Sequence, residues 1–330
     1  MRLAMTAADA VAGKGPRLLL AGFGLVGAAF VWGSAIPFTS ELLHSFDTFL
    51  LPALRFLIAA PALTMLVVIV EGRWAYGGPV PWRKVLLLGF SMAAFATCYT
   101  IGIMLSDPIT AAIIFTGGPI VASLLAKAMY RTPFEPGLGI AILLAVAGGV
   151  LLIWGVPRAT GPGLGLRGGE ALIVSAMFCW SWYSLKAQEW LGRRGFSQLR
   201  LSALTCTACG GWLLAAYGAA AWFGWSLPPV RAPGLGDFGM LLWISLLGAG
   251  LAVVMWNFGN SRVGIPVASL YGNLAPVFAV LVASLFGAPM TALQILGGML
   301  VLFGVLQVQV RRLRVARPAG GSTPGTQKIE

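Results

Sequence analysis

The chain has 330 residues, of which 58% are hydrophobic and only 10% are charged. Soluble domains carry about 25% charged residues, so this composition excludes an ordinary water-soluble protein. The net charge is +12, but the basic residues fall between apolar runs and form no single stripe. This pattern argues against nucleic-acid binding and indicates basic loops on one side of a membrane.

Apolar runs of about 20 residues follow one another along the chain, the length that an α-helix needs to cross a bilayer. Lipid offers the main chain no hydrogen-bond partners, so runs of this length are predicted to be helices. Ten transmembrane helices are expected, at Arg17–Thr39, Thr48–Val70, Trp82–Leu105, Pro108–Tyr130, Gly137–Trp154, Gly168–Gln188, Gln198–Trp225, Gly236–Ser261, Gly264–Phe286 and Met290–Val310.

The distribution of Lys and Arg predicts the topology. Segments on the same side as the N-terminus carry most of the basic residues, whereas the opposite loops hold only Arg158, Arg167 and Arg231. Both termini are therefore predicted to be cytoplasmic, in a protein that crosses the inner (plasma) membrane many times. The expected organisation is a cytoplasmic segment over 1–16, five-helix repeats over 17–156 and 168–310, and a cytoplasmic basic tail over 311–330.

An internal repeat relates the two halves. A shift of about 157 residues places Tyr99 on Trp256 and Pro119 on Pro276, and after a one-residue slip Gly148 meets Gly304. A different offset pairs Trp32 with Trp180 and Glu41 with Glu189. Because each half has an odd number of helices, the halves must be inverted relative to each other in the membrane. Inverted repeats are typical of transporters, whose substrate site lies near the midplane between them.

Several stretches resemble the drug/metabolite transporter superfamily, and more narrowly its ten-helix EamA-type exporters, which include the YddG-like amino acid exporters. The resemblance covers residues 17 to 310. It is carried by Trp32-Gly33-Ser34, Leu54-Arg55-Phe56 and Tyr99…Ala111…Pro119, and by Trp256-Asn257…Ala268…Pro276, Gly297-Gly298 and Gly304. The resemblance implies a basket of ten helices around a central cavity, lined chiefly by the first, third, fourth, sixth, eighth and ninth helices.

Polar and aromatic side chains inside apolar spans are the candidates for substrate contact. The expected lining residues are Trp32, Ser34, Tyr99, Trp180, Trp182, Tyr183, Trp256, Asn257, Tyr271 and Asn273. The alternative is that the aromatic side chains only pack between helices. Asn273, three residues before Pro276, either contacts substrate or satisfies the carbonyl group that the proline leaves free.

Two prolines and one arginine have two open interpretations each. Pro119 and Pro276 occupy equivalent mid-helix positions and are either hinges for alternating access or static kinks. Arg55, the one charge well inside the second predicted helix, either extends to the outer interface or attracts an anionic group such as a substrate carboxylate. Small residues at Ala141, Ala145 and Gly149 are predicted to pack helices closely, within the chain or between two copies.

The expected function is export of small metabolites, amino acids above all and aromatic or other apolar ones among them, by alternating access. A multidrug efflux transporter for aromatic or cationic compounds is the alternative, and a membrane-embedded enzyme a distant one. No nucleophile, metal cluster or nucleotide loop is visible, so no enzymatic activity, metal or cofactor is expected. No acidic residue lies in the middle of a predicted helix, which predicts transport without obligatory proton coupling. Asp107, at the predicted turn between the third and fourth helices, either carries a proton after all or only forms the turn before Pro108. The expected partners are a small-molecule substrate and lipid, with no nucleic acid, in a monomer or homodimer.

Overall fold

The computed structural model describes residues 14–105, 114–131, 137–154, 168–226, 229–285 and 290–316. Within these ranges the regular secondary structure is helical, and the predicted all-α, multi-span fold is confirmed. A helix is present at each of the ten predicted positions. The predicted Asp107 turn and the tail beyond 316 lie outside the described residues.

The first half contributes five helices in the predicted order. They are α2 (Lys14–Leu42), α3 (Leu50–Glu71), α4 (Trp82–Leu105), α6 (Gly118–Tyr130) and α7 (Leu138–Trp154). The fourth predicted helix, Pro108–Tyr130, is described only from residue 114 and has a turn at 116–117 before α6 begins. Pro119 lies in the first turn of α6, where its missing N–H group costs no intrahelical hydrogen bond.

The second half contributes α8 (Glu170–Trp190), α9 (Gln198–Trp222), α10 (Leu235–Leu242), α11 (Ala252–Val263), α12 (Ile265–Gly272), α13 (Leu274–Leu285) and α14 (Ala292–Ala316). Three of the expected helices differ from the continuous α-helices that the sequence predicted. The eighth contains a π-helical segment, Trp243–Leu251, between α10 and α11. The ninth is divided at Asn273 into α12 and α13. The tenth continues through the first residues assigned to the tail, because basic side chains such as Arg314 stabilise a helix C-terminus.

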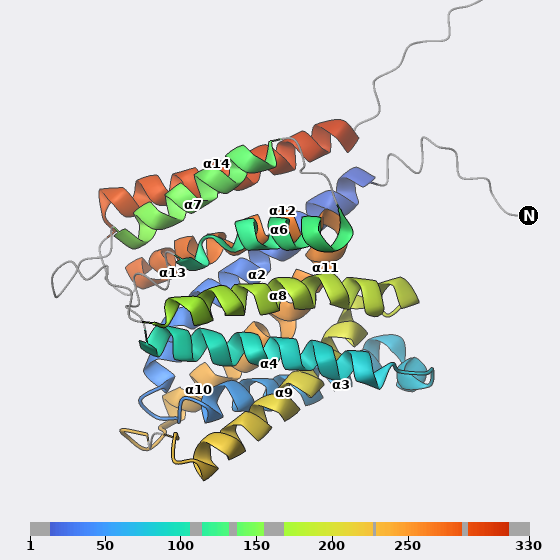
Figure 1. The fold of residues 1–330 in the computed structure, drawn as a ribbon, viewed down its shortest axis with the longest axis vertical. Coiled ribbons are helices and arrows are strands. Elements are labelled where there is room, and N and C mark those ends of the chain that lie inside the picture. The colour runs from blue at the N-terminus through green and yellow to red at the C-terminus, as the bar shows by residue number, and fades with distance from the viewer. Residues whose placement is uncertain are drawn as a thin grey trace, which may run out of the picture.

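Seven helical spans in the described ranges are long and apolar enough to cross a membrane. They include the joined segments Leu235–Val263 and Ile265–Val282. Two shorter apolar helices, α6 and α7, accompany them, and α8 has a spanning length of 21 residues with Trp, Ser and Tyr in its middle. The helices run side by side in one bundle, with α7 and α14 together along one edge (Figure 1).

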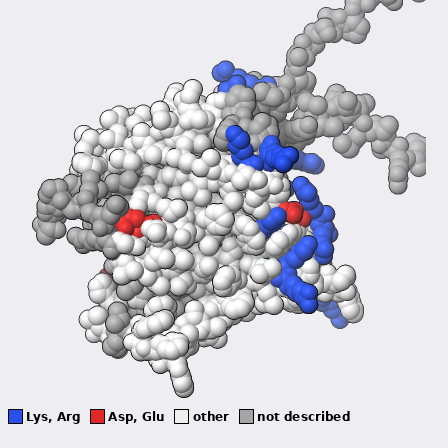
Figure 2. All heavy atoms as spheres, viewed as in Figure 1, with Lys and Arg blue, Asp and Glu red and all other residues white. Residues whose placement is uncertain are grey.

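The charged residues gather at the ends of the bundle. Figure 2 shows Lys and Arg concentrated at one end, where the described chain begins and α14 finishes. Contacts confirm that distant segments meet at this end: Arg200 lies 4.0 Å from Glu71, and the Lys84 ammonium group lies over the Trp190 ring at 5.4 Å. Arg231 forms ion pairs with Glu41, near the C-terminus of α2, and with Asp237, in the first turn of α10. These pairs lie at the opposite end of the bundle. This distribution follows the loop pattern from which the topology was predicted.

Glycines let α7 and α14 approach to main-chain contact. A Cβ atom added to Gly148 would lie 2.5 Å from the Gly297 carbonyl oxygen, and one added to Gly304 would lie 3.0 Å from the Ala141 oxygen. In the repeat, Gly148 corresponds to Gly304 and Ala141 to Gly297. The two contacts are therefore equivalent under exchange of the halves. The predicted small-residue stripe packs helices within the chain.

The two largest hydrophobic cores of the described residues fill most of the bundle. The first joins buried residues of α2, α6, α7, α11, α12, α13 and α14, and the second joins those of α3, α4, α8, α9 and α11. Trp32 of α2 and Trp180 of α8 pack against both cores. These two residues therefore mark the junction between the two parts of the bundle.

Candidate functional site

Three tryptophans meet at this junction. The ring centroids of Trp32 and Trp180 are 5.6 Å apart, those of Trp32 and Trp256 5.5 Å, and those of Trp180 and Trp256 5.6 Å. They come from α2, α8 and α11, so both halves of the chain contribute. Trp256 is buried, whereas Trp32 and Trp180 keep partial exposure. We call these three residues the tryptophan junction.

Further aromatic rings extend the junction along α4. Phe95 lies 5.1 Å from Trp180 between ring centroids and stacks on Tyr99 at 5.9 Å. Tyr99 in turn contacts Phe115 at 5.2 Å. Phe95, Tyr99 and Phe115 are all half-buried. The sequence predicted Tyr99 but not Phe95 or Phe115, although Phe95 stands one helical turn before Tyr99 and so shares its face.

The indole N–H groups of the junction differ in their partners. Trp32 Nε1 donates to the Gly248 carbonyl oxygen at 3.0 Å, and Trp256 Nε1 donates to Ser184 Oγ at 2.9 Å. In the described part of the chain, Trp180 Nε1 has no hydrogen-bond partner. Trp180 therefore combines partial exposure with a free donor, the two properties of a group that contacts a ligand.

Tyr183 and Asn257 belong to a buried polar network on one side of the junction. Asn257 Nδ2 donates to Tyr183 Oη and to Ser202 Oγ, both at 2.9 Å, and Tyr183 Oη lies 3.2 Å from Thr205 Oγ1. Tyr183 and Asn257 have no exposed surface. The network joins α8, α9 and α11, so these two residues hold helices together, while the buried Asn257 Oδ1 atom has no hydrogen-bond partner among the described residues.

Asn273 lies at the break between α12 and α13. Its Nδ2 atom donates to the main-chain oxygen of Thr116 at 2.9 Å, and Thr116 precedes α6 at the corresponding break in the first half. Asn273 is buried. The hydrogen bond satisfies the Thr116 carbonyl group, three residues before Pro119. It resembles the second interpretation from the sequence, in which Asn273 satisfies a carbonyl group that a proline leaves free. The proline concerned, however, is Pro119 of the other half and not Pro276.

The remaining predicted residues lie away from the junction. Ser34 Oγ donates to the Val31 oxygen and accepts from Trp243 Nε1 at 3.3 Å. Trp182 packs edge-on against Trp190, with 5.4 Å between centroids. The buried Tyr271 hydroxyl donates to Gln309 Oε1 at 2.8 Å. The structure thus brings together Trp32, Trp180 and Trp256, with the Tyr183 ring 5.4 Å from that of Trp180 and Tyr99 joined through Phe95.

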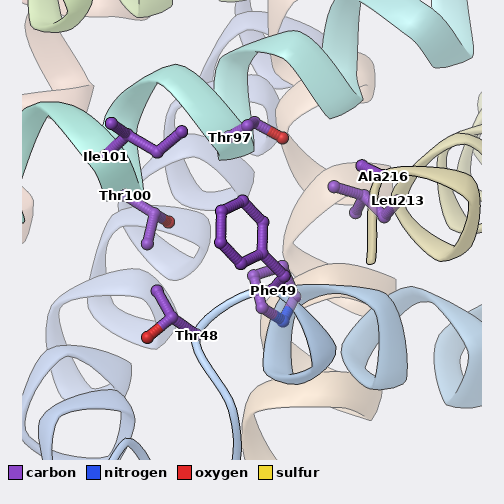
Figure 3. Close-up of a pocket in the computed structure, with 8 residues that line it drawn as sticks. Thr48, Phe49, Thr97, Thr100, Ile101, Leu213 and Ala216 are labelled. Atoms are coloured by element: carbon purple, nitrogen blue, oxygen red, sulfur yellow. The ribbon is translucent and has the colours of Figure 1, made fainter. Parts of the chain in front are cut away.

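A small pocket lies between the start of α3, α4 and α9, and none of the junction residues lines it. Its free volume is about 10 Å³, close to the space that one water molecule occupies. Figure 3 shows the Phe49 ring between Thr97 and Thr100 on one side and Leu213 and Ala216 on the other. The pocket is far smaller than an amino acid, so a substrate would require the helices around it to separate.

Comparison with known proteins identifies the family. The model of the EamA-like transporter family matches residues 19–154 and again residues 167–309, so each half carries one copy. The chain belongs to the EamA-like transporter family. It is therefore a multi-span membrane protein of the drug/metabolite transporter type.

Similar proteins extend over most of the chain. The uncharacterized transporter YyaM of Bacillus subtilis (strain 168) is 24% identical over 258 residues, covering 77% of this chain and 82% of its own. The uncharacterized transporter YrdR of the same organism is 25% identical over 292 residues, covering 84% and 88%. A solved structure, described only as the crystal structure of a protein, superposes with a TM-score of 0.73 at 21% identity, covering 89% of this chain and 98% of the other. This structural likeness supports the fold.

Proposed function

We propose that this EamA-family transporter exports small metabolites, amino acids above all, by alternating access around the tryptophan junction. The observation that carries the proposal is that Trp32 and Trp180 pack against both hydrophobic cores. A ligand placed between these rings would contact both parts of the bundle. Relative movement of the two parts would then change the ligand's access without changing its position.

Contacts at the two ends of the bundle support alternating access. At one end Arg231 pairs with Asp237 at 2.6 Å and with Glu41 at 3.0 Å. Hydrogen bonds to Asp237 and to Glu41 raise the pKa of Arg231 above its ordinary value. At the other end Glu189 pairs with Lys186 at 2.7 Å and accepts a hydrogen bond from Tyr130. Opening each end in turn would break the contacts that join distant segments, Arg231–Glu41 at one end and Tyr130–Glu189 at the other. The Lys186–Glu189 pair lies within α8 and would stay intact.

The helix breaks support the same mechanism. The turn before Pro119 and the break before Pro276 fall at equivalent places in the repeat, where intrahelical hydrogen bonds are interrupted. In such a repeat these positions are equivalent hinges, and the hydrogen bond from Asn273 to Thr116 joins them. We place both termini in the cytoplasm because the basic residues gather at that end, and we propose a monomer or homodimer in the plasma membrane.

The charges favour an amino acid over a cationic drug. The described carboxylates lie at helix ends or in connecting segments, at Glu41, Asp47, Glu71, Glu170, Glu189 and Asp237. Among the described residues near the junction, Arg55 carries the formal charge, and its guanidinium group would repel a cation. The aromatic lining itself suits a multidrug transporter equally well, which keeps that function as the second candidate.

Uptake by proteoliposomes tests the proposal. A panel of radiolabelled amino acids is offered to wild type, Trp180→Ala and the control Trp222→Ala, whose side chain is 85% exposed at the end of α9. We expect saturable uptake of one class, reduced about five- to thirtyfold by Trp180→Ala, as loss of about 1–2 kcal/mol of aromatic contact implies. The control should transport like wild type.

The same assay separates the candidates. Competition by one amino acid class supports the metabolite exporter, whereas competition by bulky aromatic cations without amino acid flux favours the drug transporter. Equal uptake by Trp180→Ala and wild type would show that the tryptophan junction is not the transport site.

A further inference from the structure

Arg55 points toward the middle of the bundle. It stands in the second turn of α3, and its Nη2 atom lies 3.5 Å from where a Cβ atom on Gly248 would be. Gly248 is near the centre of the span Leu235–Val263. An arginine that extended to the outer interface would place its guanidinium group beyond the start of α3. The first interpretation from the sequence is therefore wrong for this residue.

The guanidinium group lies beside the aromatic site. The Gly248 carbonyl oxygen that faces this region accepts the hydrogen bond of Trp32 Nε1. Arg55 also lies within electrostatic range of Tyr99 on α4 and Cys209 on α9. The pocket in Figure 3 lies along the same three helices: Pro52 and Leu213 are about one turn from Arg55 and Cys209, and Thr100 directly follows Tyr99.

Arg55 has no described partner for its charge. Its Nε atom is buried without a hydrogen bond, and in the described part of the chain the side chain makes no ion pair. The described carboxylates have other contacts: Glu41 and Asp237 bind Arg231, and Asp47 accepts from the main-chain N–H groups of 49 and 50. At the opposite end, Glu71 and Glu189 pair with Arg200 and Lys186.

A charge in this position is costly unless an anion joins it. Ionisable groups inside a membrane protein are compensated by partners or lie on a substrate pathway. Arg55 also lies against the π-helical segment Trp243–Leu251, and π-helical turns occur frequently at functional sites. Glycine at 248 leaves space that a larger side chain would take from the guanidinium group. These observations are independent of the aromatic contacts, and they point to a negatively charged ligand.

We infer that Arg55 binds the carboxylate group of the transported molecule, while the apolar part of that molecule contacts Trp180 and Tyr99. A planar guanidinium group offers the paired donors that a carboxylate accepts. The inference rests on the proposed transport site and narrows its substrates to carboxylates with an apolar or aromatic body. Amides and amines of the same shape should bind poorly.

Ligand-induced thermal stabilisation of the purified full-length protein tests the inference without requiring transport. The probes are L-phenylalanine, L-tryptophan and 3-phenylpropionate, each compared with its amide. We expect the carboxylates to raise the melting temperature of wild type by a few degrees and the amides to leave it unchanged. Arg55→Met should weaken carboxylate binding at least about tenfold, the effect of losing a charge-assisted hydrogen bond.

Two further variants keep the test decisive. Arg262→Met removes an exposed arginine at the end of α11 and should bind like wild type. Arg55→Lys keeps the charge but loses the paired donors, so it should still prefer carboxylates, with weaker affinity. Without probes, Arg55→Met should melt at or above the wild-type temperature, because an unpaired charge that is half-buried among apolar helices has been removed.

The outcomes separate this inference from the proposed function. Equal binding of carboxylates and amides, unchanged selectivity in Arg55→Met or Arg55→Lys, or no stabilisation by any carboxylate would overturn the inference. Amino acid flux could continue in each of those cases. Stabilisation that depends on Arg55, combined with no amino acid flux in proteoliposomes, would instead refute amino acid export and leave Arg55 as a carboxylate-binding residue.

Discussion

Asn273 donates a hydrogen bond to the main-chain oxygen of Thr116 at 2.9 Å, and the two residues are 157 positions apart in the chain. The same separation relates the two halves of the sequence, so Asn273 contacts its own counterpart in the repeat. The contact joins the two helix breaks directly. The two related halves of the chain therefore meet at equivalent positions here.

Replacing Asn273 with Ala should destabilise the protein by about 1–3 kcal/mol, because a buried carbonyl group loses its donor. A thermal melt in detergent measures the change. Gln307→Ala is the control, since Gln307 donates a longer hydrogen bond of 3.3 Å to Gly137 at the end of the bundle and should matter less. Equal effects of the two substitutions would show that the junction of the breaks has no special importance for stability.

Gly148→Ala should destabilise the bundle by about 1–3 kcal/mol or more. Its new methyl group would lie 2.5 Å from the Gly297 oxygen, a distance that only separation of α7 and α14 can relieve. Gly139→Ala on the same helix has open space around it and should be neutral or up to about 1 kcal/mol stabilising. Melting temperatures of both variants compare the effects. A neutral Gly148→Ala would mean that the two helices pack less closely than described.

Tyr183→Phe should lower stability by about 1 kcal/mol and leave substrate affinity unchanged. The hydroxyl group that it removes bonds Asn257 and Thr205 inside a network without exposed surface. Tyr217→Phe, on the half-buried face of α9, is the matched control and should melt like wild type. A raised KM for transport by Tyr183→Phe would instead show that the Tyr183 hydroxyl group contributes to substrate binding.

The sequence predicted the helices well because apolar length is a local property of the chain. It predicted a hinge or kink at Pro119 and at Pro276 within continuous helices, whereas the structure has a turn before α6 and divides the ninth helix at Asn273. It could not predict that Tyr183 and Asn257 pair with each other and that Tyr271 pairs with Gln309. These residues have the composition expected of a cavity lining, and only tertiary packing decides whether a polar group faces a ligand or another helix.

The π-helical segment and the direction of Arg55 were missed for a similar reason. Trp243–Leu251 is an apolar stretch with an ordinary helical pattern, and nothing local signals its wider turn. Arg55 is near enough to the start of α3 for either direction to be possible. The position of Gly248 on another helix, far away in sequence, determines which direction has space for the guanidinium group.

Substrate flux should be indifferent to a pH gradient. Each described carboxylate lies at a helix end or in a connecting segment, and none lies beside the tryptophan junction, so the described site offers no acidic group to carry a proton with the substrate. The measurement compares the initial uptake of the transported amino acid with and without an imposed gradient of about one pH unit, at equal substrate concentration.

Asp107, outside the described residues, provides the matched variant for this test. If transport is uncoupled, Asp107→Asn and wild type should each show the same initial uptake with and without the pH gradient. Gradient-driven accumulation by wild type that disappears in Asp107→Asn would assign the proton to Asp107 and refute uncoupled export. Accumulation that survives the substitution would also refute it and would require a proton carrier other than Asp107. The result matters for direction, because an uncoupled transporter moves its substrate only down that substrate's own gradient.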